Sequence, residues 1–226
     1  MFQLLAVEKI IEEIQSGMFV GLGTGPVVDF LIQKLGQRIS GGDLVDVWSV
    51  PCSKRTKSLA KSCGVPVMDL DDRGVDLCVE EVDVLDSSLQ AVKVNGDLLG
   101  GKIVANSARS VLVVNVNGFV ESFKRFKGPF AAEIEPFGFM ATLKKIYETV
   151  GEPILRRDNT SNGPLMTERG TFVVDIYFED PPLDLFKVQE KLIRIPGVVE
   201  TGFWQSLPQK AYLVCEDKVR VLSSES

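Results

Sequence analysis

The chain of 226 residues contains no histidine, and this absence narrows the chemistry open to it. Without imidazole it cannot form serine–histidine or cysteine–histidine nucleophile pairs, and it lacks the commonest metal ligand. Any proton transfer must therefore be carried out by Asp, Glu, Lys, Cys or Tyr. The chain has four cysteines, Cys52, Cys63, Cys78 and Cys215. They show no Cys-x-x-Cys spacing, which indicates reduced structural thiols rather than disulfides or zinc ligands.

A long basic run and a long apolar run are also missing. Asp and Glu outnumber Lys and Arg by 31 to 25, and the formal charge of -6 argues against a nucleic-acid-binding surface. No apolar stretch approaches the roughly 18 residues that span a bilayer, and the N-terminus lacks the basic-then-apolar order of a signal peptide. We therefore expect an intracellular soluble protein with no nucleic-acid or membrane partner. It would lie in the cytoplasm, or in a plastid if a transit peptide has been removed.

The most informative stretch that is present runs from Met18 to Val28. Apolar residues lead into glycines at alternate positions and a helical pattern follows, which predicts a buried strand turning tightly into a helix N-terminus. Pro26 suits the first helical position, and Thr24 is a candidate N-cap. Because glycines let backbone N–H groups converge where the helix dipole favours an anion, this stretch predicts an anion-binding turn. A tight turn without a ligand has the same pattern.

Apolar runs alternate with helical patterns through the first half of the chain. Strands are predicted at 18–22, 45–50, 65–70, 75–79 and 111–116. This rhythm is typical of a Rossmann-like, doubly wound α/β domain with a parallel sheet. Ligands of such domains bind beyond the carboxyl ends of the strands, where the glycine turn also lies.

Between residues 80 and 102 the pattern changes to acidic residues followed by a loop. Glu80, Glu81 and Asp83 come directly after a predicted strand, so their side chains should point at the same crevice as the glycine turn. The loop that follows contains Lys93 and Asp97. The alternative is a solvated helix cap that binds nothing.

A different unit begins near residue 131. Its predicted order is strand, helix near 137–150, strand near 153–157, a turn at Thr160 to Gly163, strand at 171–177, helix at 183–193 and strand at 198–203. That β-α-β-β-α-β order is typical of an inserted ferredoxin-like α+β domain. We therefore predict a Rossmann-like domain over 1–130 plus 206–226 and a ferredoxin-like domain over 131–205.

With these segments in order, nearly the whole chain resembles the ribose-5-phosphate isomerase type A family. The resemblance is carried by residues 16–25, 76–86, 101–105, 132–137 and 195–202. It implies an aldose–ketose isomerisation between ribose 5-phosphate and ribulose 5-phosphate in the pentose phosphate pathway, without metal or organic cofactor. It also implies a sugar-phosphate ligand and a homo-oligomer. Such chemistry needs a carboxylate to move a proton between C1 and C2, and donors for the oxyanion.

The chain departs from the family's pattern where the chemistry would occur. The family's catalytic glutamate falls on Gly101, and a phosphate-binding lysine of the family falls near Gly118, behind Asn115. In the phosphate turn, the family's Ser is Pro26 and its Thr is Val27. Two hydroxyls and one N–H are therefore missing from the turn.

The acidic motif is altered as well. The family's Asp-Gly-Ala-Asp-Glu appears as Glu80 to Val84, so the first Asp is the longer Glu80 and the second is retained as Asp83. Glu81 replaces glycine and adds negative charge where an anionic substrate would lie. The loop that begins with Lys93 is one residue shorter before Lys102 than in the family.

Two hypotheses follow from this pattern. In the first, the chain is still an isomerase: the base is Asp97 or Glu80, while Asp83 and Lys93 handle the sugar oxygens. The substrate would then be bound by Gly23, Thr24, Gly25 and Gly96. In the second, the chain is a non-catalytic relative that acts as a scaffold, a regulatory subunit or a small-ligand binder. A dinucleotide site is disfavoured, because the glycine spacing differs from Gly-x-Gly-x-x-Gly.

Overall fold

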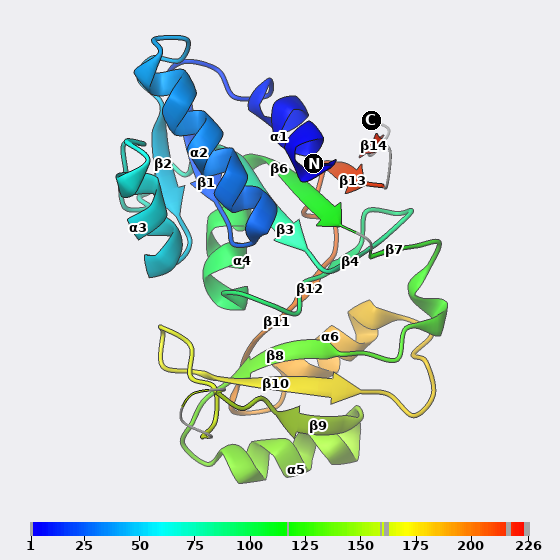
Figure 1. The fold of residues 1–226 in the computed structure, drawn as a ribbon. Helices are drawn as coiled ribbons and strands as arrows, with labels where there is room; N and C mark the ends of the chain where they lie inside the picture. Colours follow the sequence, from blue (N-terminus) through cyan, green and yellow to red (C-terminus); the bar gives the residue numbers. More distant parts are fainter. Residues whose placement is uncertain (1, 117, 159, 161–162, 216–217, 224–226) are drawn as a thin grey trace.

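The computed structural model describes residues 2–116, 118–158, 160, 163–215 and 218–223. Its largest element is a six-stranded sheet in the order β14-β13-β6-β3-β1-β2 (Figure 1). All neighbouring strands are parallel except β13 and β14. The strands are β1 (Phe19–Leu22), β2 (Trp48–Pro51), β3 (Val75–Val82), β6 (Ala108–Val116), β13 (Lys210–Val214) and β14 (Val219–Ser223).

Helices cover both faces of this sheet. One face packs against α1 (Phe2–Ile11), α2 (Pro26–Ser40) and α3 (Lys54–Ser62), and the other packs against α4 (Leu98–Asn106). Leu31 of α2 is fully buried, and burial of such a side chain contributes roughly 1.5–3 kcal/mol. The predicted doubly wound α/β fold is therefore confirmed.

The predicted strand at 65–70 is wrong in its extent. Only Val67 of this segment pairs with the sheet, through an isolated bridge to Ser49. Pro66 explains the short pairing, because proline has no N–H to donate to a ladder. Its carbonyl still accepts from Ser49 N over 2.8 Å.

The second sheet has four antiparallel strands in the order β11-β8-β10-β9. The helices α5 (Phe139–Thr149) and α6 (Leu185–Ile193) separate them in the predicted β-α-β-β-α-β sequence. The strands are β8 (Phe130–Ile134), β9 (Glu152–Leu155), β10 (Phe172–Tyr177) and β11 (Val198–Thr201). The predicted turn at 160–163 falls partly on residues outside the described ones.

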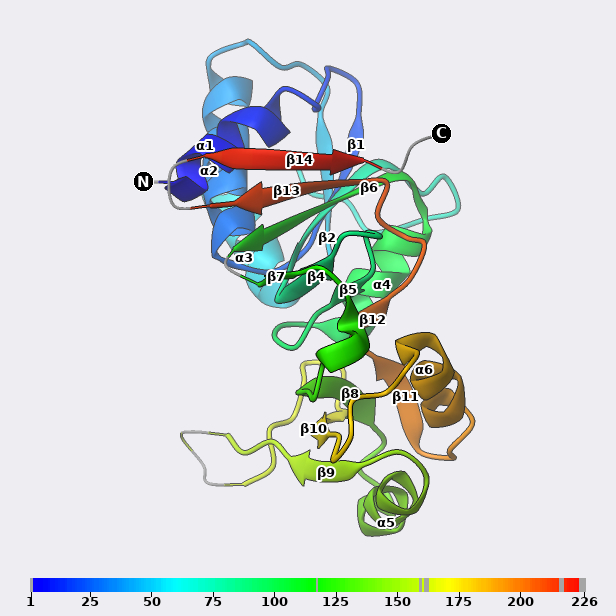
Figure 2. The same ribbon diagram turned by 90° about the vertical axis from the view of Figure 1, so that its right-hand side faces the viewer.

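A third, small sheet has no counterpart in the sequence prediction. Its short strands lie between the two larger sheets in the order β12-β5-β4-β7 (Figure 2). They are β4 (Val84–Asp86), β5 (Ala91–Val92), β7 (Phe119–Val120) and β12 (Phe203–Trp204), and the short 3-10 helix η1 (Phe123–Arg125) follows β7. The segment predicted as an acidic stretch and loop thus contains β4, β5 and the start of α4. Because Lys93 follows β5 directly, this sheet fixes its position.

No helix in the described part of the chain is both long enough and apolar enough to cross a bilayer.

Candidate functional site

The glycine turn joins β1 to α2 at the carboxyl end of the sheet, as predicted. Gly23 N donates to Val79 O over 2.9 Å, which ties the turn to β3. Gly25 has a φ of 140°, a conformation that favours glycine. A Cβ added at Gly23 would lie 2.3 Å from the Glu80 carboxyl group, and one added at Gly25 would lie 2.4 Å from Glu81 Oε2. The turn therefore needs glycine because the chain's own carboxylates pack against it.

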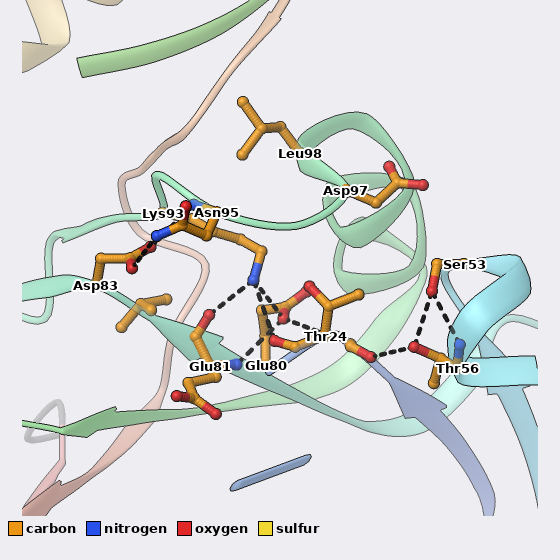
Figure 3. Close-up of polar contacts among 12 residues, drawn as sticks. Thr24, Ser53, Thr56, Glu80, Glu81, Asp83, Lys93, Asn95, Asp97 and Leu98 are labelled. Carbon is orange, nitrogen blue, oxygen red and sulfur yellow. Dashed lines mark hydrogen bonds and ion pairs between the residues drawn. The ribbon is translucent and has the colours of Figure 1, made fainter. Parts of the chain in front are cut away.

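Glu80 and Lys93 form a buried ion pair beside this turn. Their side chains are 0% and 2% exposed, and Lys93 Nζ lies 2.9 Å from Glu80 Oε1. The ammonium also donates to Thr24 O over 3.2 Å and to Glu81 O over 2.9 Å (Figure 3). All three N–H groups of Lys93 thus have acceptors within the protein.

The two oxygens of Glu80 differ in their surroundings. Besides Lys93, Oε1 accepts from Thr24 N over 2.8 Å and from Glu81 N over 3.1 Å. Oε2 has no hydrogen-bond partner within the described residues. It lies against α4, where a Cβ added at Gly101 would be only 2.6 Å away. Burial raises the pKa of Glu80, and Lys93 opposes that rise.

Glu81 completes the first turn of α2. Gly25, the N-cap residue, has no side chain to accept from the helix, and Pro26 at the start of α2 has no N–H. Val27 N instead donates to Glu81 Oε2 over 2.7 Å. Burial raises the pKa of Glu81, and the hydrogen bond from Val27 works against this.

Asp83 holds the loop that follows β5. Its carboxylate accepts from Val94 N over 2.6 Å, from Asn95 N over 3.1 Å and from Asn95 Nδ2 over 2.8 Å. Gly96 in the same loop has a φ of 88°, and a Cβ there would fall 2.1 Å from Thr24 Oγ1. The loop therefore packs directly on the glycine turn, which brings Gly96 and Thr24 together.

Asp97 is not brought to the Glu80–Lys93 pair. It is the N-cap of α4 and accepts from Gly100 N. Its Oδ2 also lies 3.2 Å from Nε of Arg169. Figure 3 shows its carboxylate directed away from the Lys93 ammonium. The shorter loop positions Asp97 as a helix cap rather than turning it toward Glu80.

Backbone atoms enclose Gly118, near which the resemblance places a phosphate-binding lysine of the family. A Cβ added at Gly118 would lie 1.8 Å from Asp83 O, so no side chain fits there. Asn115 Nδ2 donates to Val82 O and Asp83 O over 3.0 Å each, and its Oδ1 accepts from Gly118 N over 3.0 Å. Neither Asn115 nor Gly118 supplies a cation to this corner of the crevice.

The cysteines near the site are free thiols. Burial raises the pKa of both Cys52 and Cys78, and the nearby Glu80 carboxylate adds to this effect. Both thiols therefore stay protonated and are poor nucleophiles.

Sequence reasoning missed three residues that make long-range contacts to helix N-termini or to the end of β2. Glu133 of β8 is fully buried and accepts from Leu98 N and Leu99 N at the start of α4 over 3.0 and 3.1 Å. Glu168 accepts from Lys54 N at the start of α3. Arg169 donates to Cys52 O over 2.7 Å, in addition to its pairing with Asp97. No local pattern marks these residues, since each partner is 34 or more residues away.

Comparison with known proteins agrees with the architecture. The family model described as ribose 5-phosphate isomerase A (phosphoriboisomerase A) matches residues 48–218. Ribose-5-phosphate isomerase A of Thermosynechococcus vestitus is 35% identical over 195 residues, which cover 85% of this chain and 82% of that protein. A probable ribose-5-phosphate isomerase 3 of Arabidopsis thaliana, named as chloroplastic, is 30% identical over 97% of this chain and 82% of its own length.

A solved structure gives the same result. A D-ribose-5-phosphate isomerase in complex with phospho-erythronic acid superimposes with a TM-score of 0.92 at 26% sequence identity. The alignment covers 99% of this chain and 98% of that one.

Proposed function

Because the chain belongs to the ribose 5-phosphate isomerase A family, we propose that it is a non-catalytic member, which keeps the family's fold and binds a ligand or partner without isomerising ribose 5-phosphate. One observation carries the proposal. The position of the family's base is Gly101, and the space beside it is taken by Glu80, a buried carboxylate paired with Lys93.

The other carboxylates near the crevice already have structural roles. Asp83 accepts three hydrogen bonds from its own loop, and Asp97 caps α4 while pairing with Arg169. A general base must reach the proton that it removes, and neither carboxylate is free to turn. Loss of a positioned base typically costs about 10²–10⁴ in rate.

The test is conversion of ribose 5-phosphate to ribulose 5-phosphate by the purified full chain. The Thermosynechococcus vestitus relative, assayed at equal concentration, is the positive control. We expect a rate at least about 10² below that of the relative, as for an enzyme without its base. Turnover comparable to that of the relative would overturn the proposal.

Glu80 Oε2 favours a second candidate, a weak isomerase. This oxygen is unpartnered within the described residues and lies beside Gly101, so Glu80 could have taken over as the base. In that case a measurable rate is lost in Glu80→Gln and kept in Asp97→Asn. The opposite result would assign the base to Asp97. Circular dichroism of both variants shows whether a lost rate reflects a lost fold.

Restoring the family's residues provides a further test. In Gly101→Glu alone the new side chain collides with Glu80, because its Cβ would lie 2.6 Å from Oε2. We therefore expect no rate from that variant and a gain in rate from Glu80→Asp/Glu81→Gly/Gly101→Glu. If the single variant were as active as the triple one, Glu80 would not be what blocks the site.

Three finer features remain proposals for this chain. The solved complex with phospho-erythronic acid supports the sugar part of the family's sugar-phosphate ligand, because Glu81 works against a phosphate group here. Homo-oligomerisation is checked by light scattering after size-exclusion chromatography. Location in the cytoplasm or a plastid is supported by the chloroplastic Arabidopsis thaliana relative and is checked by imaging a tagged chain.

A further inference from the structure

Two backbone donors at the glycine turn are already occupied by glutamates of the same chain. Thr24 N donates to Glu80 Oε1 over 2.8 Å, and Val27 N donates to Glu81 Oε2 over 2.7 Å. Pro26 between them has no N–H. An anion arriving at this helix N-terminus would have to compete with both carboxylates for the same amides.

Glu81 also fills the space above the turn. A Cβ added at Gly25 would lie 2.4 Å from Glu81 Oε2 and 2.6 Å from its Cβ and Cδ atoms. The side chain is therefore in close contact with the backbone along its length. A phosphate could approach Gly25 only if Glu81 moved away.

Independent evidence for the kind of ligand comes from Glu80. Its side chain is fully buried, Oε2 has no partner among the described residues, and a Cβ at Gly23 of the turn would lie 2.5 Å from this oxygen. A buried acceptor without a donor is unfavourable. A hydroxyl group can donate to it, whereas the dianion of a phosphate monoester has no proton to donate.

The charges at the site point the same way. Lys93 is already paired with Glu80, and neither Asn115 nor Gly118 carries a positive charge. A phosphate bound to the turn would lie beside the carboxylates of Glu80 and Glu81, and like charges a few ångströms apart repel.

We propose that Glu81 is a specificity-determining residue that occupies the anion-binding turn and restricts the crevice to ligands placing an uncharged, hydroxyl-bearing group there, such as an unphosphorylated polyol. The inference rests on the proposed function, in which the crevice binds a small ligand without converting it. It names the ligand class that the crevice rejects and the class that it accepts.

The experiment measures binding of inorganic phosphate to the full chain by titration calorimetry. Glu81→Gly restores the family's residue, and Glu81→Gln keeps the shape while removing the charge. We expect no saturable phosphate binding by the unmodified chain. Glu81→Gly should bind phosphate at least about tenfold more tightly than the upper limit of affinity measured for the unmodified chain, because a like charge is removed from the turn. Glu81→Gln should lie between them.

Glu168→Gln is the matched control. Glu168 also accepts from the backbone of a helix N-terminus, at Lys54 of α3, but it does not contact the glycine turn. This variant should bind phosphate no better than the unmodified chain. The unmodified chain should also bind ribose 5-phosphate no more tightly than ribose.

Two results would overturn the inference: a folded Glu81→Gly protein whose phosphate affinity equals that of the unmodified chain, or tighter binding of ribose 5-phosphate than of ribose by the unmodified chain. If Glu81→Gly does not fold, Glu81→Gln becomes the test variant. The inference is then overturned if Glu81→Gln binds phosphate with the same affinity as the unmodified chain. The proposed function is tested separately, by turnover of ribose 5-phosphate, because the phosphate titration involves no reaction.

Discussion

A fully buried glutamate from a strand lies beside the N-terminus of each of α2 and α4, but the two carboxylates are hydrogen-bonded differently. At α4, Glu133 accepts from Leu98 N and Leu99 N through one oxygen and from Thr171 Oγ1 over 2.6 Å through the other. Beside α2, Glu80 is equally buried, yet only one of its oxygens has hydrogen-bond partners among the residues that the structure describes.

This difference separates a structural carboxylate from one in an altered site. Buried polar groups in native proteins are nearly always hydrogen-bonded, so Glu133 is the ordinary case and ties β8 to α4. Glu80 is the exception. Its carboxyl extends into the space beside Gly101, where it is stabilised chiefly by Lys93 and not by a full set of donors. A buried polar group without a full set of partners is costly, and native proteins break such rules mainly at functional sites.

Among the variants that test this comparison, Lys93→Met is expected to change the free energy of unfolding most. It leaves the Glu80 carboxylate buried and unpaired, so the free energy of unfolding should fall by about 3–5 kcal/mol. Urea denaturation followed by circular dichroism measures it. The double variant Glu80→Gln/Lys93→Met removes both charges and should recover most of this loss. If the double variant were as unstable as Lys93→Met, packing and not charge pairing would explain the loss.

At the other helix end, Glu133→Ala is expected to have a somewhat smaller effect. It leaves two backbone N–H groups and the Thr171 hydroxyl without their acceptor, and water that enters the space left by the side chain should limit the total loss to roughly 1–3 kcal/mol. Glu133→Gln keeps an acceptor for the amides and should lose less. Equal losses in both variants, measured by urea denaturation, would show that the negative charge rather than hydrogen bonding matters at α4.

Much of the fold was accessible from the sequence because regular elements repeat apolar residues at fixed periods. The run from Met18 to Val28 predicts β1, the turn and α2, since the glycines and Pro26 indicate where the strand ends and the helix begins. The third sheet could not be predicted in this way. Strands of two or three residues, such as β5 at Ala91–Val92, are too short to show any period.

The candidate site was accessible only in part. That Glu80 and Glu81 face the glycine turn follows from their place at the carboxyl end of a strand; the structure extends that strand, β3, through Val82 and places both side chains at the turn. Which atoms they bind does not follow from the sequence, because it depends on side-chain lengths in a packed crevice. Asp97 shows the same limit: an Asp before a helix is a good N-cap, but its partner Arg169 is 72 residues away.

The smallest effect is expected from Glu81→Gln, examined as a function of pH. Burial raises the pKa of Glu81 above its ordinary value of 4.5, so the folded chain holds that proton more tightly than the unfolded chain. The stability that this adds is present below pH 4.5 and is lost as the pH rises through the folded-state pKa. The unmodified chain should therefore lose stability relative to Glu81→Gln as the pH rises from about 4 to neutral. Because Glu81 is partly exposed, solvent screening should keep the change below about 1 kcal/mol.

Urea denaturation of the unmodified chain and of Glu81→Gln across this pH range gives the difference in stability. A difference that moves the opposite way would mean that the Val27 hydrogen bond outweighs burial, and the end of α2 would then resemble the fully satisfied end of α4.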